Sequence, residues 1–307
     1  MNQTSSNPCH WNGVSCSENG TRVIGIDLSE SYITGQLFNS FSSLSDLQYL
    51  DLSKNKINEV IPDDLKRCHN LVYLNLFDNR LEGEMNLSRL IILEILDLSM
   101  DRISAEVQFS FLTFCNGLVV ANLSNNNFGG RIDDGFDARR NLQYLGLTSN
   151  NFVGGLWTGF VRLVDFSVAD NNLSGSISES TLWENCSLQV LDLSGNNFSA
   201  ELSGKMSNCK NLVVLNFWGN NFTGLISVEV GSISTLEGLF LGRNSFDRAI
   251  PETLVNLQNL AFLDSCKNEF GGDIQEKTMV LVKKMTLYQH SIGKLHCRVT
   301  IVDWYWG

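Results

Sequence analysis

A short block built on two leucines separated by one residue recurs along the whole chain at nearly constant spacing. Residues 50–55 read LDLSKN, residues 74–79 read LNLFDN and residues 191–196 read LDLSGN. The residue that closes each block marks the series Ser31, Asn55, Asn79, Asp101, Asn126, Asn150, Asn171, Asn196, Asn220, Asn244 and Asn268. Successive markers lie 21 to 25 residues apart, mostly 24. A unit of this length cannot bury an apolar face alone, so about eleven units must stack into a solenoid.

Each block predicts a short strand followed by a turn. Leu50 and Leu52 are two positions apart, so both point to the same side of a strand, and the residues between them face solvent. The marker Asn begins the turn, where its side-chain amide can satisfy backbone groups that the bend leaves unpaired. We therefore interpret the Asn column as structural, with Ser31 and Asp101 as tolerated exceptions.

The turn after each marker carries a glycine followed by an aliphatic residue. Residues 34–37 read TGQL, 174–177 read SGSI and 223–226 read TGLI, and the glycine permits a tight second bend. Here the sequence resembles the plant-specific class of leucine-rich repeats, over residues 23–275, although the proline of that class remains only at Pro62 and Pro251. The resemblance implies an α/β leucine-rich-repeat solenoid with a curved parallel β-sheet on its concave face. Short 3-10 or irregular turns are expected on the convex face.

The segment before the first repeat, residues 1–22, resembles the N-terminal cap of plant receptor ectodomains. Residues 9–16 read CHWNGVSC, with the cysteines, tryptophan and glycine of that cap in place. The resemblance implies a Cys9–Cys16 disulfide, and the closed loop would cover the apolar end and the unpaired edge of the first strand. A disulfide indicates an oxidising compartment. A zinc site would need two more ligands, and only His10 is near, so we expect no metal.

The remaining cysteines of the repeats form a column, because Cys68, Cys115, Cys186 and Cys209 each lie two or three residues before a repeat-opening leucine. We expect free thiols that pack as small hydrophobic groups. Cys186 and Cys209 lie in adjacent repeats and could also approach each other. A nucleophilic pair of Cys68 and His69 would require an orientation that consecutive turn residues seldom provide. We therefore predict no catalytic residue and no cofactor.

The charge of the chain limits its partners. The 307 residues include 33 acidic and 22 basic ones, for a net charge of -11, which excludes nucleic acid and favours basic or neutral partners. An apolar run of about eighteen residues, long enough for a membrane span, is missing from the sequence. The N-terminal residues do not resemble a secretory signal, so we expect that the chain as given cannot export or anchor itself.

Asn-x-Ser/Thr sequons suggest glycosylation, and the candidates that we retain are Asn86, Asn172, Asn185, Asn197 and Asn221, with further matches at Asn2, Asn19 and Asn122. Three of them, Asn172, Asn197 and Asn221, each follow the marker Asn of successive repeats. We expect their glycans to shield that flank and to leave the concave face or the opposite flank for partners.

Candidate ligand-binding residues break the small, polar pattern of the concave face. Trp218 and Phe240 occupy solvent-facing positions in adjacent repeats, and Arg243 lies beside them. Exposed aromatic residues next to an arginine are typical of binding hot spots. Alternatively, each aromatic ring packs on a neighbour across the strands. Both interpretations remain open at this stage.

The pattern fails near the C-terminus, where Ser265 replaces an inward leucine, and we expect the last repeat to be weak. Residues 276–307 fit neither a repeat nor a cysteine-paired cap, and we interpret them as a divergent tail. An amphipathic helix over residues 276–287 could cover the open end.

Residues 64–71 (DLKRCHNL), 118–124 (LVVANLS) and 166–171 (FSVADN) resemble the nematode-induced group of leucine-rich-repeat receptor kinases of plants. The resemblance implies an extracellular ligand-sensing module at the outer face of the plasma membrane, in immune or pest perception. It also implies a peptide or small-molecule ligand and a co-receptor leucine-rich-repeat kinase. We predict no enzyme activity, because neither a Gly-rich nucleotide loop nor a His-Arg-Asp catalytic loop occurs in the chain.

Two other readings compete. One is a secreted inhibitor that resembles the polygalacturonase-inhibiting proteins, which end in a paired-cysteine cap that the sequence does not predict here. The other is a non-functional fragment of a disrupted receptor gene, favoured by Ser265 and the divergent tail.

Overall fold

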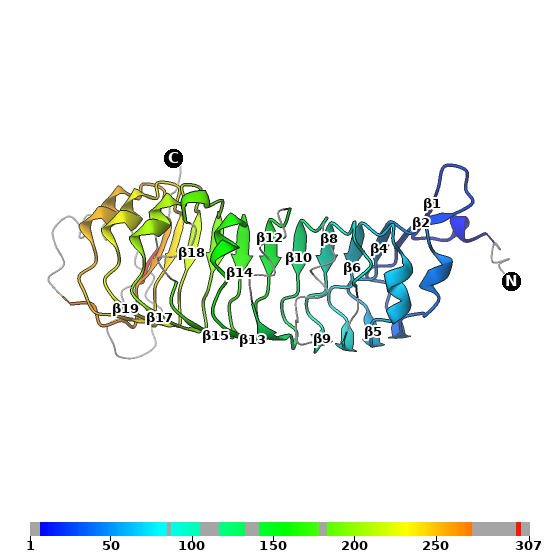
Figure 1. Cartoon of the computed structure of the whole chain (residues 1–307), viewed down its shortest axis with the longest axis horizontal. Helices are drawn as coiled ribbons and strands as arrows, with labels where there is room; N and C mark the ends of the chain where they lie inside the picture. The colour runs from blue at the N-terminus through cyan, green and yellow to red at the C-terminus, as the bar shows by residue number, and fades with distance from the viewer. Residues whose placement is uncertain are drawn as a thin grey trace. The chain divides into compact units, whose positions relative to one another are not determined.

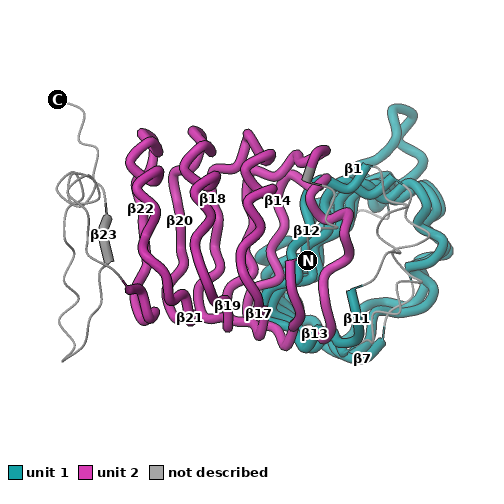
Figure 2. The backbone as a smooth tube through the Cα atoms, turned by 60° about the vertical axis from the view of Figure 1, so that its left-hand side comes forward, with its two compact units in different colours: residues 1–152 teal, residues 153–307 magenta. Residues whose placement is uncertain are grey.

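The computed structural model describes residues 7–84, 87–104, 117–132, 141–177, 183–271 and 299–301. The chain divides into two compact units, residues 1–152 and 153–307, which Figure 2 shows in different colours. Each unit is described by itself.

In residues 1–152, each repeat contributes one short strand to a main parallel sheet (Figure 1). The parallel strands are β2 (Val23–Asp27), β4 (Tyr49–Asp51), β6 (Tyr73–Asn75), β8 (Ile95–Asp97), β10 (Val120–Asn122) and β12 (Tyr144–Gly146), and β1 (Val14–Cys16) pairs antiparallel with β2. Leu50 lies opposite Leu74, and Leu74 opposite Leu96, so the inward leucines stack from repeat to repeat and are fully buried. This register is the one that the sequence repeat predicts.

In residues 153–307, the main sheet follows the same rule. Its parallel strands are β14 (Asp165–Ser167), β16 (Val190–Asp192), β18 (Val214–Asn216), β20 (Gly238–Phe240) and β22 (Phe262–Asp264), and β23 (Val299–Ile301) pairs antiparallel with β22. The core of this unit contains a ladder of parallel phenylalanine rings, in which Phe222 stacks on Phe198 and on Phe246 with centroids 6.4 and 6.3 Å apart. The inward positions are therefore filled by aromatic as well as by aliphatic side chains.

The other two sides of each repeat are also regular. A second strand follows each turn: β3 (Thr34–Gln36), β5 (Lys56–Glu59), β7 (Arg80–Gly83), β9 (Arg102–Ile103), β11 (Gly129–Arg131), β13 (Asn151–Gly154), β15 (Asn172–Gly175), β17 (Asn197–Ala200), β19 (Asn221–Gly224) and β21 (Ser245–Phe246). The return to the main sheet uses short 3-10 helices: η2 (Phe41–Ser43), η3 (Asp63–Arg67), η5 (Thr158–Arg162), η6 (Trp183–Asn185), η7 (Gly204–Asn208), η8 (Val228–Ser232) and η9 (Glu252–Asn256), and η1 (Pro8–His10) precedes β1.

The marker asparagines hold neighbouring repeats together, as Asn79 illustrates. Its Oδ1 accepts from the Ile57 N–H at 3.0 Å, and its Nδ2 donates to the carbonyls of Leu52 at 3.0 Å and Leu76 at 2.9 Å. Asn244 makes the equivalent bonds in the other unit. These side chains are buried, so the structural interpretation of the Asn column is confirmed.

Asp101 occupies the marker position with a carboxyl group and is only 9% exposed. Its Oδ1 accepts from the Leu81 N–H at 2.7 Å, but its Oδ2 has no hydrogen-bond partner among the described residues. A carboxylate cannot donate to carbonyls as the Asn amide does. Burial raises the pKa of Asp101 to about 8, the Leu81 N–H opposes this shift, and the charges of Asp78 and Asp97 add to it.

The cysteines differ from the expectation of free thiols. Cys186 and Cys209 form a disulfide, so the prediction is wrong for this pair, because the shared register of adjacent repeats places their Cα atoms 5.0 Å apart. Cys68 is a buried free thiol, as expected, and Cys115 lies outside the described residues.

The C-terminal repeat also differs from expectation. Cys266, in the last repeat, is disulfide-bonded, with its partner outside the described residues. The tail of residues 276–307, for which no cysteine-paired cap is expected, lies outside the described residues except for residues 299–301. A cysteine next to the inward Ser265 could pair, but neither spacing nor periodicity indicated it. Ser265 is buried at the leucine position. The helix expected over residues 276–287 lies outside the described residues.

We predict that Asp101→Asn stabilises the protein more at pH 8 than at pH 5. The raised pKa means that the folded state binds more protons than the unfolded state between about pH 4 and pH 8, so stability falls as pH rises through this window, by at most about 1.4 kcal/mol per pH unit. Urea unfolding midpoints of the wild type and the variant at both pH values measure the effect. Asn79→Asp is the matched control and should introduce the same pH dependence. If the urea midpoints of the wild type and of Asp101→Asn changed equally between pH 5 and pH 8, the prediction would be contradicted.

We also predict that the double variant Cys186→Ser, Cys209→Ser unfolds more easily than the wild type. The disulfide closes a loop of 23 residues in sequence separation, and loop-closure entropy gives a loss of about 3 kcal/mol. The unfolding midpoint in denaturant measures it. Under strong reductant the unfolding midpoints of the wild type and the variant should become equal. A difference between the midpoints that persists in reductant would show that loss of the disulfide does not cause the destabilisation.

Candidate functional site

The solvent-facing side of the main sheet in residues 153–307 carries the predicted ligand-binding residues. On β18, β20 and β22 the side chains of Asn216, Phe240 and Asp264 lie in register across the strands. Two residues beyond the end of β18, Trp218 is half-buried, and Gly242 occupies the equivalent position beyond β20 in the next repeat. An aromatic side chain and a glycine therefore occupy equivalent positions of adjacent repeats.

Arg243 and Trp218 are brought together. The guanidinium carbon of Arg243 lies 4.7 Å from the centroid of the Trp218 ring, a cation–π contact. Arg243 has a φ of 52°, a turn conformation that residues such as Lys54 and Asp78 share at the same point of their repeats. Its N–H donates to the Cys266 carbonyl at 2.7 Å. The backbone of the turn thus holds the exposed guanidinium against the ring.

Asp264 completes the group, which we name the Trp218 cluster (Trp218, Arg243 and Asp264). A Cβ on Gly242 would lie 2.7 Å from both carboxylate oxygens of Asp264, so this carboxylate occupies the space above Gly242. Its Oδ1 accepts from the Cys266 N–H at 2.8 Å. Burial raises the pKa of Asp264, while the Cys266 N–H and the positive charge of Arg243 oppose the shift. An aromatic ring, a cation and an anion therefore share one part of the sheet.

Phe240 is not part of this cluster. A Cβ on Gly238 would lie 2.9 Å from the Phe240 ring, so the ring covers Gly238 in its own strand. Gly238 and Gly242 lie on opposite sides of Phe240 along the chain. Phe240 therefore packs within its own strand rather than across the strands, and Trp218 and Arg243 remain together as a candidate binding surface.

The structure does not support nucleophilic chemistry at Cys68. Its side chain is fully buried, and burial, with a contribution from the charge of Asp64, raises the pKa of the thiol to about 11. The His69 Nδ1 lies 3.4 Å from the Arg89 carbonyl. A thiol of this kind stays protonated at neutral pH and is a poor nucleophile. Within the described residues, His, Cys, Asp and Glu side chains form no group of three that could hold a metal ion.

A second exposed aromatic group lies in residues 1–152 and was missed by the sequence reasoning. Tyr49 on β4 and Tyr73 on β6 stack with ring centroids 4.4 Å apart and planes 9° apart. The predicted candidates follow the first inward leucine of their blocks, whereas these tyrosines precede Leu50 and Leu74. The repeated Tyr at one position of two successive repeats is the signal that could have found them.

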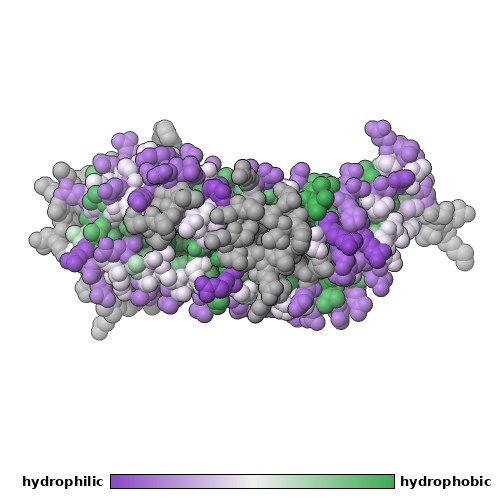
Figure 3. All heavy atoms as spheres, in the orientation of Figure 1, coloured by the Kyte–Doolittle hydropathy of each residue, from purple (hydrophilic) through white to green (hydrophobic). Residues whose placement is uncertain are grey.

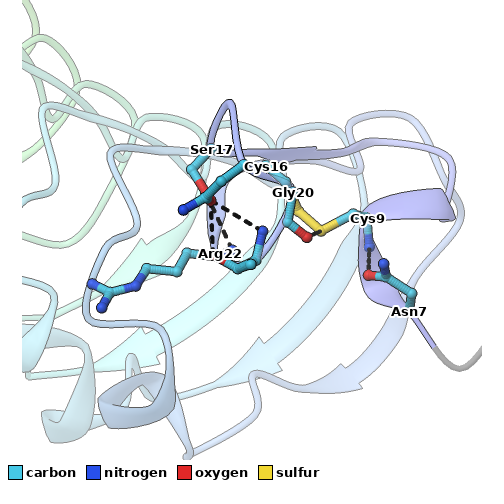
Figure 4. Close-up of a disulfide and its surroundings, with 8 residues drawn as sticks. Asn7, Cys9, Cys16, Ser17, Gly20 and Arg22 are labelled. Carbon is cyan, nitrogen blue, oxygen red and sulfur yellow. Dashed lines mark hydrogen bonds between the residues drawn. A yellow bond between two sulfur atoms is a disulfide. The ribbon is translucent and has the colours of Figure 1, made fainter.

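The N-terminal cap contains the Cys9–Cys16 disulfide, which joins η1 to β1 (Figure 4). The Asn7 Oδ1 accepts from the Cys9 N–H at 3.0 Å. The β1–β2 connection projects from the sheet in Figure 1 and is hydrophilic in Figure 3. Trp11 is 56% exposed, so the cap protects the edge of the first repeat through β1 pairing with β2 more than through this ring.

The sequons of the described residues differ in exposure. Asn172, Asn197 and Asn221 are exposed at the first positions of β15, β17 and β19, and Asn185 is exposed at the end of η6. Asn122 is half-buried, and its Nδ2 donates to Asp97 and to Ser99. Asn86 lies outside the described residues. None of the helices within the described residues has the length and apolar character needed to cross a membrane.

Known proteins resemble this chain in sequence and in fold. The leucine rich repeat family matches residues 22–81, 187–209 and 211–233. A probable LRR receptor-like serine/threonine-protein kinase of Arabidopsis thaliana is 59% identical over 206 residues, which cover 67% of this chain and 19% of that relative. The chain thus spans about a fifth of the length of this relative.

Two solved structures show the same fold. The LRR ectodomain of the Arabidopsis thaliana receptor kinase GASSHO1/SCHENGEN3, in complex with CASPARIAN STRIP INTEGRITY FACTOR 2, has a TM-score of 0.67 and 27% identity and covers 88% of this chain and 38% of that chain. The plant peptide hormone receptor RGFR1 in complex with RGF2 has a TM-score of 0.60 and 27% identity. The match covers 80% of this chain and 47% of that chain. These matches confirm the predicted solenoid of parallel strands and short 3-10 helices. The chain belongs to the leucine-rich-repeat family, and its repeats are similar to those of plant LRR receptor-like serine/threonine kinases.

Proposed function

We propose that this chain is an extracellular ligand-sensing module of a plant receptor-like kinase, and that it binds a peptide across the main sheet of residues 153–307. The observation that carries the proposal is the Trp218 cluster. It places a half-buried aromatic ring and two opposite charges on a sheet face of the same fold as receptors solved with their peptide partners.

The geometry suits a peptide in an extended conformation. Successive strands offer one side chain each at constant register, so a peptide that crosses them meets one row of contacts for each repeat. Trp218 supplies a large apolar contact, while Arg243 and Asp264 supply charge complementarity that orients the peptide. The ring and the guanidinium are already in contact, so little side-chain entropy is lost on binding.

The same proposal places the chain outside the cell, where disulfides persist. Catalysis would belong to a kinase elsewhere in the receptor, and a co-receptor leucine-rich-repeat kinase would join after ligand binding. We propose that glycans at Asn172, Asn197 and Asn221 cover one flank, so that the co-receptor docks elsewhere. A role in immune or pest perception remains part of this proposal.

A secreted inhibitor similar to the polygalacturonase-inhibiting proteins is the second candidate. The disulfide at Cys266 favours it, because such inhibitors end in a paired-cysteine cap. Inhibition of a fungal polygalacturonase by the purified chain, with no effect of Trp218→Ala on peptide binding, would favour this candidate over the receptor module.

We predict that Trp218→Ala and Arg243→Ala each weaken peptide binding about tenfold or more, because truncating a hot-spot residue removes over 1.4 kcal/mol. The full chain, secreted from plant cells, selects ligands from a displayed random-peptide library, and biolayer interferometry measures the affinity of the enriched peptides for each variant. Val228→Ala, at an exposed site on η8, is the matched control and should bind as the wild type does. Failure to enrich any peptide, or equal binding by all variants, would refute the proposed site.

We further predict that peptide mapping of the secreted protein finds glycans at Asn172, Asn197 and Asn221 and an unmodified Asn122. The first three side chains are exposed, whereas the Asn122 amide is held by Asp97 and Ser99. Mass spectrometry after deglycosylation in heavy-oxygen water reports each site. Three bare asparagines in the β15, β17 and β19 column would remove the proposed shielded flank.

A further inference from the structure

One contact between neighbouring repeats differs from the others in its chemistry. Where the marker is an asparagine, its Nδ2 donates to a carbonyl of the preceding repeat, as Asn79 does to Leu52 at 3.0 Å. The same cross-repeat bond occurs at Asn55, Asn126, Asn150, Asn196, Asn220, Asn244 and Asn268. The marker Asp101 has no amide hydrogen to donate. We name the contact between residues 73–83 and residues 95–103 the Asp101 joint.

The Asp101 joint keeps the bond that a marker side chain accepts and loses the bonds that it donates. The Asp101 Oδ1 accepts from the Leu81 N–H at 2.7 Å. This bond matches the one between the Ile57 N–H and the Asn79 Oδ1 one repeat earlier. The Asp101 Oδ2 is buried and has no hydrogen-bond partner among the described residues. The joint therefore holds an unpartnered oxygen where other joints hold an amide, and a charge on that oxygen is costly to bury.

Neighbouring acids make a charge at this position still less favourable. Asp78 lies in the turn after β6, and Asp97 is the last residue of β8. Burial raises the pKa of Asp101 to about 8, the Leu81 N–H opposes the shift, and the charges of Asp78 and Asp97 add to it. The buried carboxyl group therefore holds its proton in neutral solution.

The nearby cations do not neutralise Asp101. Arg80 and Arg102, which lie on β7 and β9 of the joint, are exposed. Among the described residues, no ion pair joins Asp101 to a basic side chain. The following repeat presents the uncharged Asn125 and Asn126 to this turn. A carboxylate in the closed joint thus has no positive partner.

The turn that contains Asp101 also supports polar residues on the solvent-facing side of the main sheet. The Asp97 Oδ1 accepts from the N–H and the Oγ of Ser99, at 2.9 and 2.6 Å. The Asn122 Nδ2 donates to the Asp97 Oδ2 at 3.2 Å and to the Ser99 Oγ at 3.0 Å. A movement of this turn therefore disturbs the polar network that joins β8 to β10.

We propose that the Asp101 joint is a pH-sensitive hinge, which stays closed while the Asp101 carboxyl group holds its proton and opens locally when that proton is lost. With the proton in place, the closed joint buries a neutral group. Without it, the joint buries a carboxylate with one unpartnered oxygen beside two other acids, and opening lets water solvate the charge. The joints with an asparagine marker have no titrating marker and stay closed. The inference goes beyond the proposed function and does not depend on it, because the hinge needs no ligand.

The direction of the effect follows from proton linkage. A solvated Asp carboxyl group has a pKa of about 4, so opening the joint releases a proton between about pH 4 and pH 8. The equilibrium constant for opening therefore rises by up to about tenfold per pH unit across this window and levels off above it. Below the window both states hold the proton, and opening is least favourable.

Hydrogen exchange of the full secreted chain, read by mass spectrometry with fragmentation that resolves single amides, tests the hinge. Rates are measured between about pH 5 and pH 9, and each is divided by the intrinsic rate of an unfolded amide at the same pH. The Leu81 N–H reports on the Asp101 joint, and the Ile57 N–H reports on the joint one repeat earlier. We expect the protection of Leu81 to fall about tenfold or more between pH 5 and pH 8, while that of Ile57 stays constant.

Three variants locate the effect. Asp101→Asn removes the titrating group and should make the protection of Leu81 independent of pH. Asn79→Asp places a carboxyl group in the preceding joint and should transfer the pH dependence to Ile57. Glu82→Gln, which removes an exposed carboxylate from β7 of the same joint, is the matched control and should keep the wild-type profile. Urea midpoints near pH 5 show that each variant is folded, and Asp101→Asn with Glu82→Gln carries the test if Asn79→Asp does not fold.

The outcomes separate a local hinge from unfolding of the whole repeat array. Equal pH profiles for Leu81 and Ile57 in the wild type would overturn the hinge, because the pH dependence would then be global. A Leu81 profile that still falls with pH in Asp101→Asn would overturn it as well, since another group would be responsible. A profile that Asp101→Asn flattens and Glu82→Gln preserves supports the hinge, whatever the peptide library shows at the Trp218 cluster.

Discussion

Buried asparagine amides are the interaction on which the rest of the structure depends. The strands of the main sheet are only three to five residues long, so the turns that follow them leave backbone groups inside the protein without strand partners. Asn79, for example, donates to carbonyls of its own repeat and of the preceding one and accepts an N–H from the preceding one, and Asn244 makes the equivalent bonds. Because these bonds cross from repeat to repeat, they fix the spacing and the register together. Asp101 shows the cost of replacing the amide by a carboxyl group, since its Oδ2 has no partner among the described residues and burial raises its pKa.

Constant register has a consequence for the exposed face of the sheet. Side chains at equivalent positions of adjacent repeats become neighbours, so a glycine at such a position gives its space to another group. Phe240 covers Gly238, and the Asp264 carboxylate lies above Gly242. Gly25, opposite Tyr49, is buried, while the Tyr49 ring stacks on Tyr73. Glycines on the exposed face therefore decide where the larger side chains beside them lie.

The repeats and the cap were predictable because their signals are local and recur many times. Leu50 and Leu52 point inward by strand geometry alone, and the 24-residue period then requires stacking. The candidate site was predictable only in part. Trp218 and Arg243 were found because they depart from a column of small polar residues, but the direction of the Phe240 ring depended on Gly238. The tyrosine pair could not be predicted from one repeat, because Tyr49 and Tyr73 meet only when β4 and β6 pair in register.

The sequence by itself determined the strand positions, the inward leucines and the structural role of the marker asparagines, since periodicity and backbone hydrogen bonding leave few alternatives. Tertiary structure decided which groups meet across repeats. It paired Cys186 with Cys209, set Arg243 on Trp218 and buried Asp101 with a raised pKa. Each of these depends on distances between residues some 20 to 30 positions apart in the chain, and only the packed register sets those distances.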